Sequence, residues 1–120
     1  MSYRVDLSGE AQADIDSLPD RESKLAAVRV ALALRDDPYF GKALRNRIRI
    51  GDLSSCRGVA FDRPDWKDKP RFRLVYRSGP DDASIEVVQV LAIGLRTQLE
   101  VYKRAAERLR RELRRRLRDS

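Results

Sequence analysis

The stretch RFRLVYR, from Arg71 to Arg77, decides how the middle of this 120-residue chain folds. Its aromatic and β-branched residues are typical of a β-strand, and strand geometry places Arg71, Arg73, Val75 and Arg77 on one face. Further along, GLRT (94–97) predicts the end of another strand that turns directly into a helix. We therefore expect arginines from two strands to lie near the beginning of that helix.

The remaining segments predict the order β-α-α-β-β-β-α. The expected elements are a strand at 3–7, a helix from Ser8 to Leu18, a helix from Asp20 to about Arg35, and strands at 55–62, 72–77 and 85–93. Ser8 and Asp20 have the side chains of helix N-caps. In the second helix, Leu25, Val28, Leu32 and Arg35 recur at helical spacing. Arg47 to Ile50 alternates like a short strand but could equally be an extended loop.

The last element is predicted to be a long basic helix. Thr97 and Glu100 have the spacing of a capping box, which places the beginning of the helix at about Gln98. Arg96 then precedes the cap, and the ring of Tyr102 leans back toward the junction because helical side chains point toward the N-terminus. An apolar stripe follows, formed by Tyr102, Ala106, Leu109, Leu113 and Leu117. The fold class is therefore α+β: a small antiparallel sheet of about four strands, an N-terminal αα-hairpin and this C-terminal helix.

Composition limits the possible functions. The net charge is +7, and ten lysines and arginines against four acids after residue 94 supply +6 of it, which favours nucleic acid, ribosome, a membrane surface or an acidic protein as partner. The sequence has no run of eighteen apolar residues, so it predicts no membrane-spanning helix. The absence of histidine and the single Cys56 exclude a Cys/His zinc site and a Ser-His-Asp triad. We expect no cofactor or metal, a buried Cys56 and a cytoplasmic location.

The strand–helix junction suggests phosphate chemistry. Arg73 and Arg96 could stabilise charge on a phosphodiester, and Tyr102 could orient the substrate. The alternative is structural: the arginines pair with Glu86, Asp81 or Glu100, and Tyr102 only begins the apolar stripe. Residue pattern alone leaves both interpretations open.

The segments 71–77 and 90–96, followed by EVY (100–102) and AAERL (105–109), resemble the C-terminal half of the RelE/ParE toxin superfamily. The N-terminal strand and helical hairpin are similar to the same family in order and length, so the resemblance covers about residues 3–109. It implies a four-stranded antiparallel sheet with a helical hairpin, in a toxin of a type II toxin–antitoxin pair that its cognate antitoxin wraps. We accordingly divide the chain into a RelE-like domain (1–109) and an arginine-rich helical extension (110–120).

Within that family, the RelE branch cuts mRNA in the ribosomal A site by attack of the 2′-hydroxyl on the adjacent phosphate, whereas the ParE branch poisons DNA gyrase. Arg73, Arg96 and Tyr102 match the nuclease residues, so the resemblance implies a ribosome-dependent mRNA endonuclease with these three as catalytic residues. We expect the RNA and rRNA contacts to come from Arg57, Arg71, Arg104 and Arg108.

One departure weakens the nuclease interpretation. RelE nucleases typically carry lysines on the strand that here reads CRGVAF (56–61), one of them as general base, and Arg57 has too high a pKa for that role. Lys67 and Lys69 in the next loop are possible substitutes. A ParE-like gyrase inhibitor and a non-catalytic nucleic-acid-binding module remain alternatives. The leucines of the C-terminal helix could also pair with a second copy or with an acidic antitoxin helix.

Overall fold

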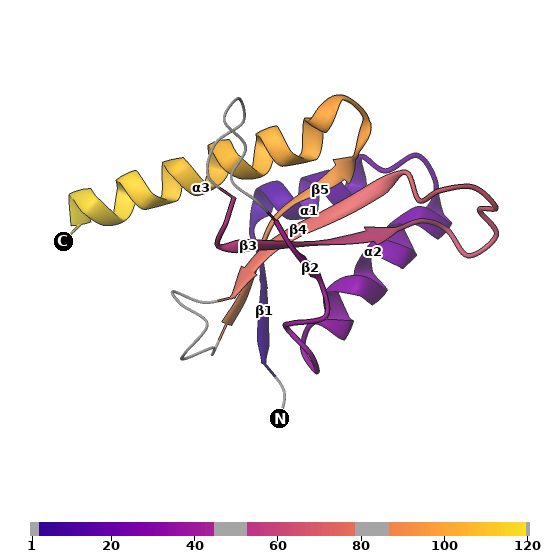
Figure 1. Ribbon diagram of the computed structural model, residues 1–120, viewed down its shortest axis with the longest axis horizontal. Helices are drawn as coiled ribbons and strands as arrows, with labels where there is room; N and C mark the ends of the chain where they lie inside the picture. Colours follow the sequence, from indigo (N-terminus) through magenta and orange to yellow (C-terminus); the bar gives the residue numbers. More distant parts are fainter. Residues whose placement is uncertain (1–2, 45–52, 79–86, 120) are drawn as a thin grey trace.

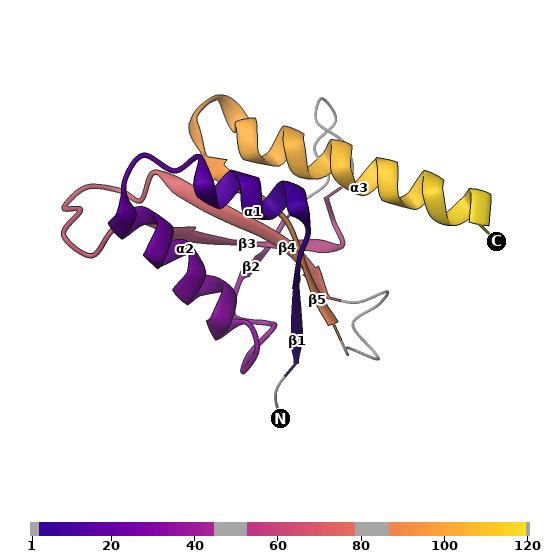
Figure 2. The same ribbon diagram turned by 180° about the vertical axis from the view of Figure 1, so that it is seen from behind.

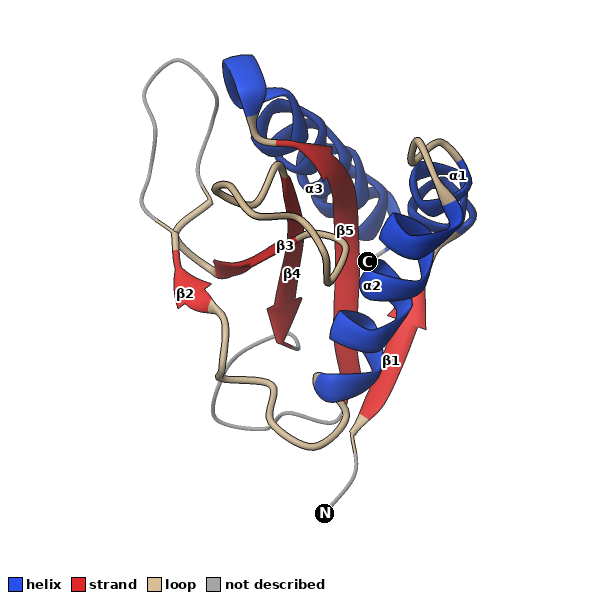
Figure 3. Ribbon diagram, turned by 90° about the vertical axis from the view of Figure 1, so that its right-hand side faces the viewer, coloured by secondary structure: helices blue, strands red, loops and turns tan. Residues whose placement is uncertain are grey.

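The computed structural model describes residues 3–44, 53–78 and 87–119 (Figure 1). The elements are β1 (Arg4–Leu7), α1 (Gly9–Asp16), α2 (Arg21–Ala33), β2 (Lys42–Ala43), β3 (Cys56–Phe61), β4 (Phe72–Ser78), β5 (Val87–Leu95), a 3-10 turn (Thr97–Leu99) and α3 (Glu100–Asp119). The strands form one sheet in the order β1-β5-β4-β3-β2, which Figure 3 shows from one side. The predicted α+β class is confirmed.

The sheet differs from the prediction in two respects. It has five strands rather than about four, because the short β2 pairs with β3. It is also mixed, since β1 runs parallel to β5 while the other pairs are antiparallel. The short strand considered at 47–50 lies outside the described residues.

Local capping explains where the helical hairpin begins. The Ser8 hydroxyl accepts a hydrogen bond from the Ala11 N–H at 3.1 Å, and the Asp20 carboxylate accepts one from the Ser23 N–H at 2.8 Å. Both predicted N-caps are therefore confirmed. The two helices end about two residues earlier than predicted, at Asp16 and Ala33.

Two apolar clusters lie on opposite faces of the sheet. α1 and α2 cover one face (Figure 2), where Leu74, Tyr76 and Ile93 are fully buried. α3 covers the other face, and Val75, Leu91 and Cys56 belong to that cluster. A register shift opposite Val75 and Tyr76 leaves Leu91 without a pairing partner in β4, so Leu91 and Ala92 both join the α3 cluster.

The hairpin helix α2 buries small side chains and exposes its larger apolar ones. Its buried face is made of small residues, with Ala27 at 0% and Ala31 at 4% exposure. The larger apolar side chains Leu25, Val28 and Leu32, which recur at helical spacing, are 43%, 39% and 51% exposed. The stripe therefore faces away from the sheet.

The strand–helix junction also differs from the predicted capping box. α3 begins at Glu100, not Gln98, and residues Thr97–Leu99 form a 3-10 turn instead. The cause lies in the sheet: the Arg96 N–H still donates to the Arg71 carbonyl at 3.0 Å, so strand pairing continues to the point where the cap was expected. Leu99 closes the turn at φ 60, a conformation that non-glycine residues seldom adopt.

The helix α3 packs on the sheet only along its first half. Leu109 is 4% exposed, whereas Leu113 and Leu117 are 44% and 77% exposed where the helix projects past the strands (Figure 1). Cys56 is buried, as expected. Within the described residues, none of the helices has the length and apolar character needed to cross a membrane.

Candidate nucleic-acid interface

The paired ends of β4 and β5 bring three of the predicted arginines together. Arg73 lies directly opposite Gly94, and two residues further along, the backbone of Arg71 bonds that of Arg96. Because alternate residues share a face, Arg71 and Arg73 belong with Val75 to the face that α3 covers. The predicted meeting of arginines near the beginning of α3 is therefore confirmed.

Arg73 is held by backbone rather than by an acid. Its Nη1 donates to the carbonyls of Pro70, at 3.0 Å, and Phe72, at 2.9 Å. The side chain is half-buried, and no carboxylate of the described residues lies within ion-pair distance of it. Among the described residues, Arg73 thus presents a positioned positive charge without an acidic partner; Glu86 and Asp81, two of the acids considered as partners, lie outside those residues. Such a charge suits an incoming phosphate.

Arg96 is exposed and stands at the first residue before the 3-10 turn. Across the part of the chain that the structure describes, it has no ion pair, and Glu100, the acid proposed to neutralise it, is not bonded to it. Its backbone is fixed at both sides, by Arg71 in the sheet and by the Leu99 N–H in the turn. The backbone of Arg96 is therefore held in place, whereas its side chain is exposed to solvent.

Tyr102 is 7% exposed and belongs to the cluster between α3 and the sheet, beside Val75 and Leu91. The prediction that its ring leans back over the junction rested on a helix beginning at Gln98. With α3 beginning at Glu100, Tyr102 lies in the first turn, and its ring is core.

Arg57 lies on the other face of the sheet. It pairs in register with Tyr76, which belongs to the cluster under the helical hairpin. Its Nη1 donates to the Gly41 carbonyl at 3.1 Å, and its guanidinium lies 5.4 Å from the centre of the Tyr39 ring. The structure therefore does not bring Arg57 together with Arg73 and Arg96.

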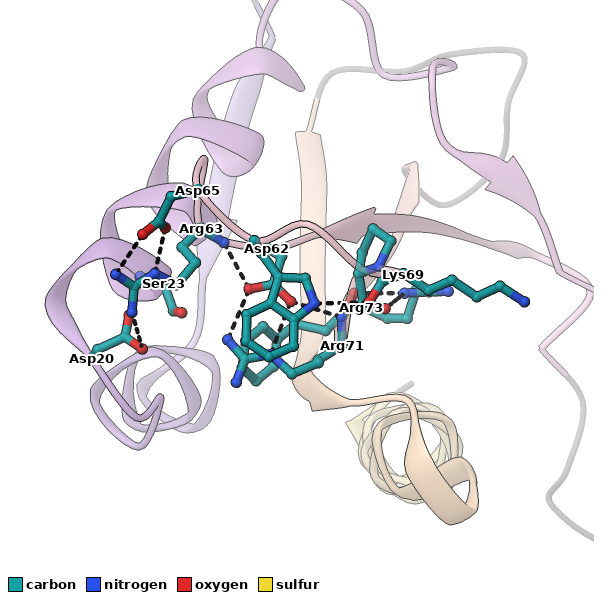
Figure 4. Close-up of polar contacts among 11 residues, drawn as sticks. Asp20, Ser23, Asp62, Arg63, Asp65, Lys69, Arg71 and Arg73 are labelled. Atoms are coloured by element: carbon teal, nitrogen blue, oxygen red, sulfur yellow. Dashed lines mark hydrogen bonds and ion pairs between the residues drawn. The ribbon is translucent and has the colours of Figure 1, made fainter.

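Arg71 is neutralised by Asp62, at the end of the neighbouring strand (Figure 4). Its guanidinium forms a two-pronged pair with the carboxylate, Nε–Oδ2 3.0 Å and Nη2–Oδ1 2.9 Å, and its backbone N–H donates to Oδ2 at 2.9 Å. Burial raises the pKa of Asp62, but the hydrogen bonds from Arg71 and from the Arg63 backbone outweigh it, so the pKa lies below its ordinary value. The Trp66 ring stacks on the same guanidinium, 3.6 Å from its centre.

Arg104 and Arg108, on α3, reach across the edge of β5 to one buried carboxylate. Asp14 on α1 is 6% exposed and accepts from Arg108 Nη1 at 2.7 Å, from Arg104 Nη1 at 2.8 Å and from the Ile93 N–H at 3.0 Å. Arg108 also pairs with Glu10 at 3.2 Å. The hydrogen bond to Asp14 raises the pKa of Arg108 further.

Sequence reasoning missed Asp14 and Asp62 as partners. Asp14 carried a signal, because it stands between Ala11, Ile15 and Leu18 on the apolar side of α1. An acid on the buried face of a helix requires a cation or hydrogen-bond donors. Asp62 gave a weaker signal, since it stood in a turn in which acids and bases alternate.

A further buried arginine lies between the sheet and α3. Arg77 is 7% exposed; its Nε donates to Gln89 at 2.9 Å, and its Nη2 lies 3.8 Å from a Glu112 oxygen on α3. Burial lowers the pKa of Arg77. This contact is structural in character, because the side chain hardly reaches solvent.

Comparison with known proteins shows similarity to a solved structure. No protein-family model matches the chain, and no curated protein matches it significantly. A chain of the toxin–antitoxin complex RelBE2 from Mycobacterium tuberculosis superposes with a TM-score of 0.56 and 26% sequence identity, over 80% of this chain and 100% of that chain. This similarity confirms the resemblance to the RelE/ParE toxin superfamily that the sequence showed, and with it the RelE-like fold.

Proposed function

We propose that the chain is the toxin of a type II toxin–antitoxin pair and that it cuts mRNA on the ribosome. The similarity to a chain of the RelBE2 complex supports the toxin assignment and an antitoxin as partner. The observation that carries the nuclease proposal is the contrast among the junction arginines. Arg71 is neutralised by an acid, whereas Arg73 and Arg96, on the same pair of strand ends, have no acidic partner among the described residues.

In this proposal, a 2′-hydroxyl attacks the adjacent phosphate, the bond from phosphorus to the 5′-oxygen of the next nucleotide breaks, and that oxygen takes up a proton and leaves behind a 2′,3′-cyclic phosphate. Arg73 and Arg96 stabilise the negative charge that develops on the phosphate oxygens. Arg73 supplies a charge fixed by backbone carbonyls, which needs little reorganisation during the reaction. Arg96 supplies a charge on an exposed side chain whose backbone is held in place, so its guanidinium can follow the phosphate during the reaction. The role of Tyr102 in positioning substrate stays a prediction; with 7% exposure, the side chain offers little surface for such a contact.

The proton of the 2′-hydroxyl still needs an acceptor. β3 carries no lysine, and the guanidinium of Arg57 lies on the opposite face and stays protonated. Lys69 is the nearest candidate in sequence, because it precedes Pro70, whose carbonyl anchors Arg73 (Figure 4). Lys69 is exposed, so its amine is free to move. A reaction that depends on so mobile a base would be slow without additional positioning by the ribosome.

The predicted RNA contacts of Arg71, Arg104 and Arg108 have a cost that those of Arg73 and Arg96 do not. Each would have to leave Asp62 or Asp14, or bind RNA while it remains paired. Those contacts therefore stay predictions, as do the division at residue 109 and the cytoplasmic location.

The test is to induce the protein and map mRNA 5′ ends on translating ribosomes. We expect cuts in phase with codons, abolished by Arg73→Ala combined with Arg96→Ala. Arg29→Ala, an exposed arginine on the far side of α2, is the matched control and should leave the cuts unchanged. Absence of phased cuts with the unmodified chain would overturn the nuclease proposal.

Two features favour a ParE-like gyrase inhibitor as the second candidate: β3 has no lysine, and Tyr102 is largely buried. Neither feature hinders a protein that binds without cutting. Double-strand DNA breaks that depend on gyrase, without phased mRNA cuts, would establish this candidate instead.

A further inference from the structure

Trp66 is an exposed aromatic residue that the proposed chemistry does not use. It lies in the loop between β3 and β4 and is 39% exposed. Neither apolar cluster of the described residues includes it, so its ring does not serve the core. It is also not among the residues that the resemblance to the toxin superfamily implies for the site. A large aromatic ring left outside the core suits the recognition of another molecule.

The Trp66 ring is nevertheless held in place. Its Nε1 donates to the Lys69 carbonyl at 3.1 Å, and its backbone N–H donates to the Arg63 carbonyl at 3.1 Å. The guanidinium of Arg71 lies 3.6 Å from the ring centre and covers one face. Because Arg71 is itself held by its two-pronged pair with Asp62, the ring rests on a positioned support. The exposed part of the ring is therefore its other face and its rim.

The ring lies beside the charge that we assign to phosphate binding. Trp66 Nε1 is bonded to the carbonyl of Lys69, and Arg73 Nη1 is bonded to the carbonyl of the next residue, Pro70, at 3.0 Å (Figure 4). The α-carbons of consecutive residues lie about 3.8 Å apart, so one short backbone segment anchors both the aromatic face and the guanidinium. A nucleotide likewise joins a flat base to a phosphate through a single sugar. One strand of RNA can therefore contact both groups at once.

Cations predominate around the exposed face of the ring. Lys67 and Lys69 are exposed, and neither is in an ion pair in the part of the chain that the structure describes. Asp62 and Asp65 are paired with arginines, which leaves Asp68 as the acid of this loop without an ion pair among the same residues. Such a surround attracts a phosphate backbone. An apolar protein surface would instead have to remove these charges from water at a cost.

We propose that the open face of Trp66 stacks on an unpaired base of a single-stranded RNA whose phosphate is bound by Arg73. The proposal rests on the proposed RNA cleavage, because it assigns the ring to the strand that the junction arginines bind. Every base has a π face, so the stacking positions the strand without selecting its sequence. A support that is already held in place reduces the ordering cost of this contact. Trp66 is accordingly a positioning residue.

The fluorescence of the full chain tests the proposal, because its single tryptophan makes the emission report on this ring alone. The probe is a single-stranded RNA of about six nucleotides, methylated at every 2′-oxygen so that the attacking hydroxyl is blocked. We expect saturable quenching of the emission. An abasic strand with the same phosphates should leave the emission unchanged. It should also bind about tenfold more weakly, as measured by competition with a labelled copy of the probe. Both comparisons use the unmodified chain and need no variant.

Substitutions at the ring add a second, independent measurement. Trp66→Ala should weaken binding of the probe by about tenfold and leave binding of the abasic strand unchanged. Trp66→Phe should restore most of the affinity, because a phenyl ring can still stack. Tyr39→Ala is the matched control, since Tyr39 is another exposed ring that lies beside an arginine, Arg57. Binding of the probe by this control should stay within about twofold of that by the unmodified chain.

Four results would overturn the proposal. The probe binds without quenching the emission, the abasic strand binds and quenches equally, or Trp66→Ala weakens both strands alike, which would show that the ring only supports the loop. The fourth is that the probe does not bind, which would leave the ring to a protein partner. None of these results depends on cutting. Codon-phased cuts by a chain that fails the stacking test would contradict stacking alone, whereas stacking without phased cuts would contradict the nuclease proposal alone.

Discussion

Asp14 and Arg108 lie ninety-four residues apart in sequence and 2.7 Å apart in the structure, Oδ2 to Nη1. The same carboxylate binds Arg104 and the Ile93 N–H, so one side chain joins α1, β5 and α3. β1 pairs with β5 only as far as Val90. Beyond that point, the Asp14 carboxylate takes the place of a neighbouring strand and accepts the hydrogen bond of the Ile93 N–H.

Asp14→Ala should destabilise the protein by about 3–5 kcal/mol, because it leaves a partly buried guanidinium and a buried backbone N–H without their acceptor. Urea unfolding followed by circular dichroism measures the change. Asp16→Ala is the control, since Asp16 lies on the same helix but is exposed. Equal effects of the two substitutions would show that Asp14 is not the link between the helices.

Interactions between residues close in sequence could be predicted, whereas contacts that depend on the folded arrangement could not. Ser8 and Asp20 cap helices through residues three positions away, so their roles follow from sequence. The pairs Asp14–Arg108 and Asp62–Arg71 depend on the folded arrangement, so the sequence predicts Arg71 and Arg108 as RNA contacts without revealing their acidic partners. Those contacts stay predictions.

Periodicity shows which residues share a helix face but does not show which face is buried. In α2 the alanine face packs inward and the leucine face outward, because small side chains allow close approach to the sheet. Likewise, the capping-box pattern at Thr97 was overridden by the backbone bond between Arg96 and Arg71, which extends the strand pairing. In both places a tertiary contact outweighs a local pattern.

Gly94→Ala tests the passage of Arg104 across β5. A methyl group at Gly94 would collide with the guanidinium of Arg104, which has to move away from Asp14. We expect a loss of about 1–2 kcal/mol in urea unfolding. In an Arg104→Ala background the same glycine substitution should cost clearly less, since the colliding group is gone. Gly9→Ala, where no atom lies within 4 Å, controls for the loss of glycine itself.

Gly41→Ala should be more damaging than Gly94→Ala, because its added carbon would lie 2.6 Å from the hydroxyl of the fully buried Tyr76. That hydroxyl accepts from the Gly41 N–H at 3.0 Å and donates to the Pro38 carbonyl at 2.8 Å, so it has no room to move. We expect a loss of about 2–3 kcal/mol. A ring carbon of Tyr76 would also lie 2.7 Å from the added carbon. The denaturant midpoint of Gly41→Ala in a Tyr76→Phe background therefore shows how much of the loss comes from the hydroxyl and how much from the ring that remains.

The pH dependence of stability should depend on Asp62. Its folded pKa lies below the ordinary 3.8, so ionised Asp62 contributes stability that is complete above that value and is lost as the pH falls through the folded pKa. Asp62→Asn should therefore flatten the acid limb of stability below about pH 4 and lower stability at neutral pH. Urea midpoints measured across this range check it, with Asp68→Asn, an exposed acid in the same turn, as control. An unchanged acid limb would contradict the prediction.

Arg57 and Arg73 lie on opposite faces of the sheet, so their substitutions should affect mRNA cutting differently. Arg57 projects toward the hairpin face and is held by the Gly41 carbonyl, whereas Arg73 belongs to the α3 face beside Arg96. If phosphate is stabilised at the strand–helix junction, Arg73→Ala should reduce mRNA cutting by about a hundredfold or more. Arg57→Ala should change it by less than about threefold. Primer extension on ribosome-bound mRNA gives both values. Equal losses would mean that RNA reaches both faces of the sheet, and the junction could then not be the whole of the site.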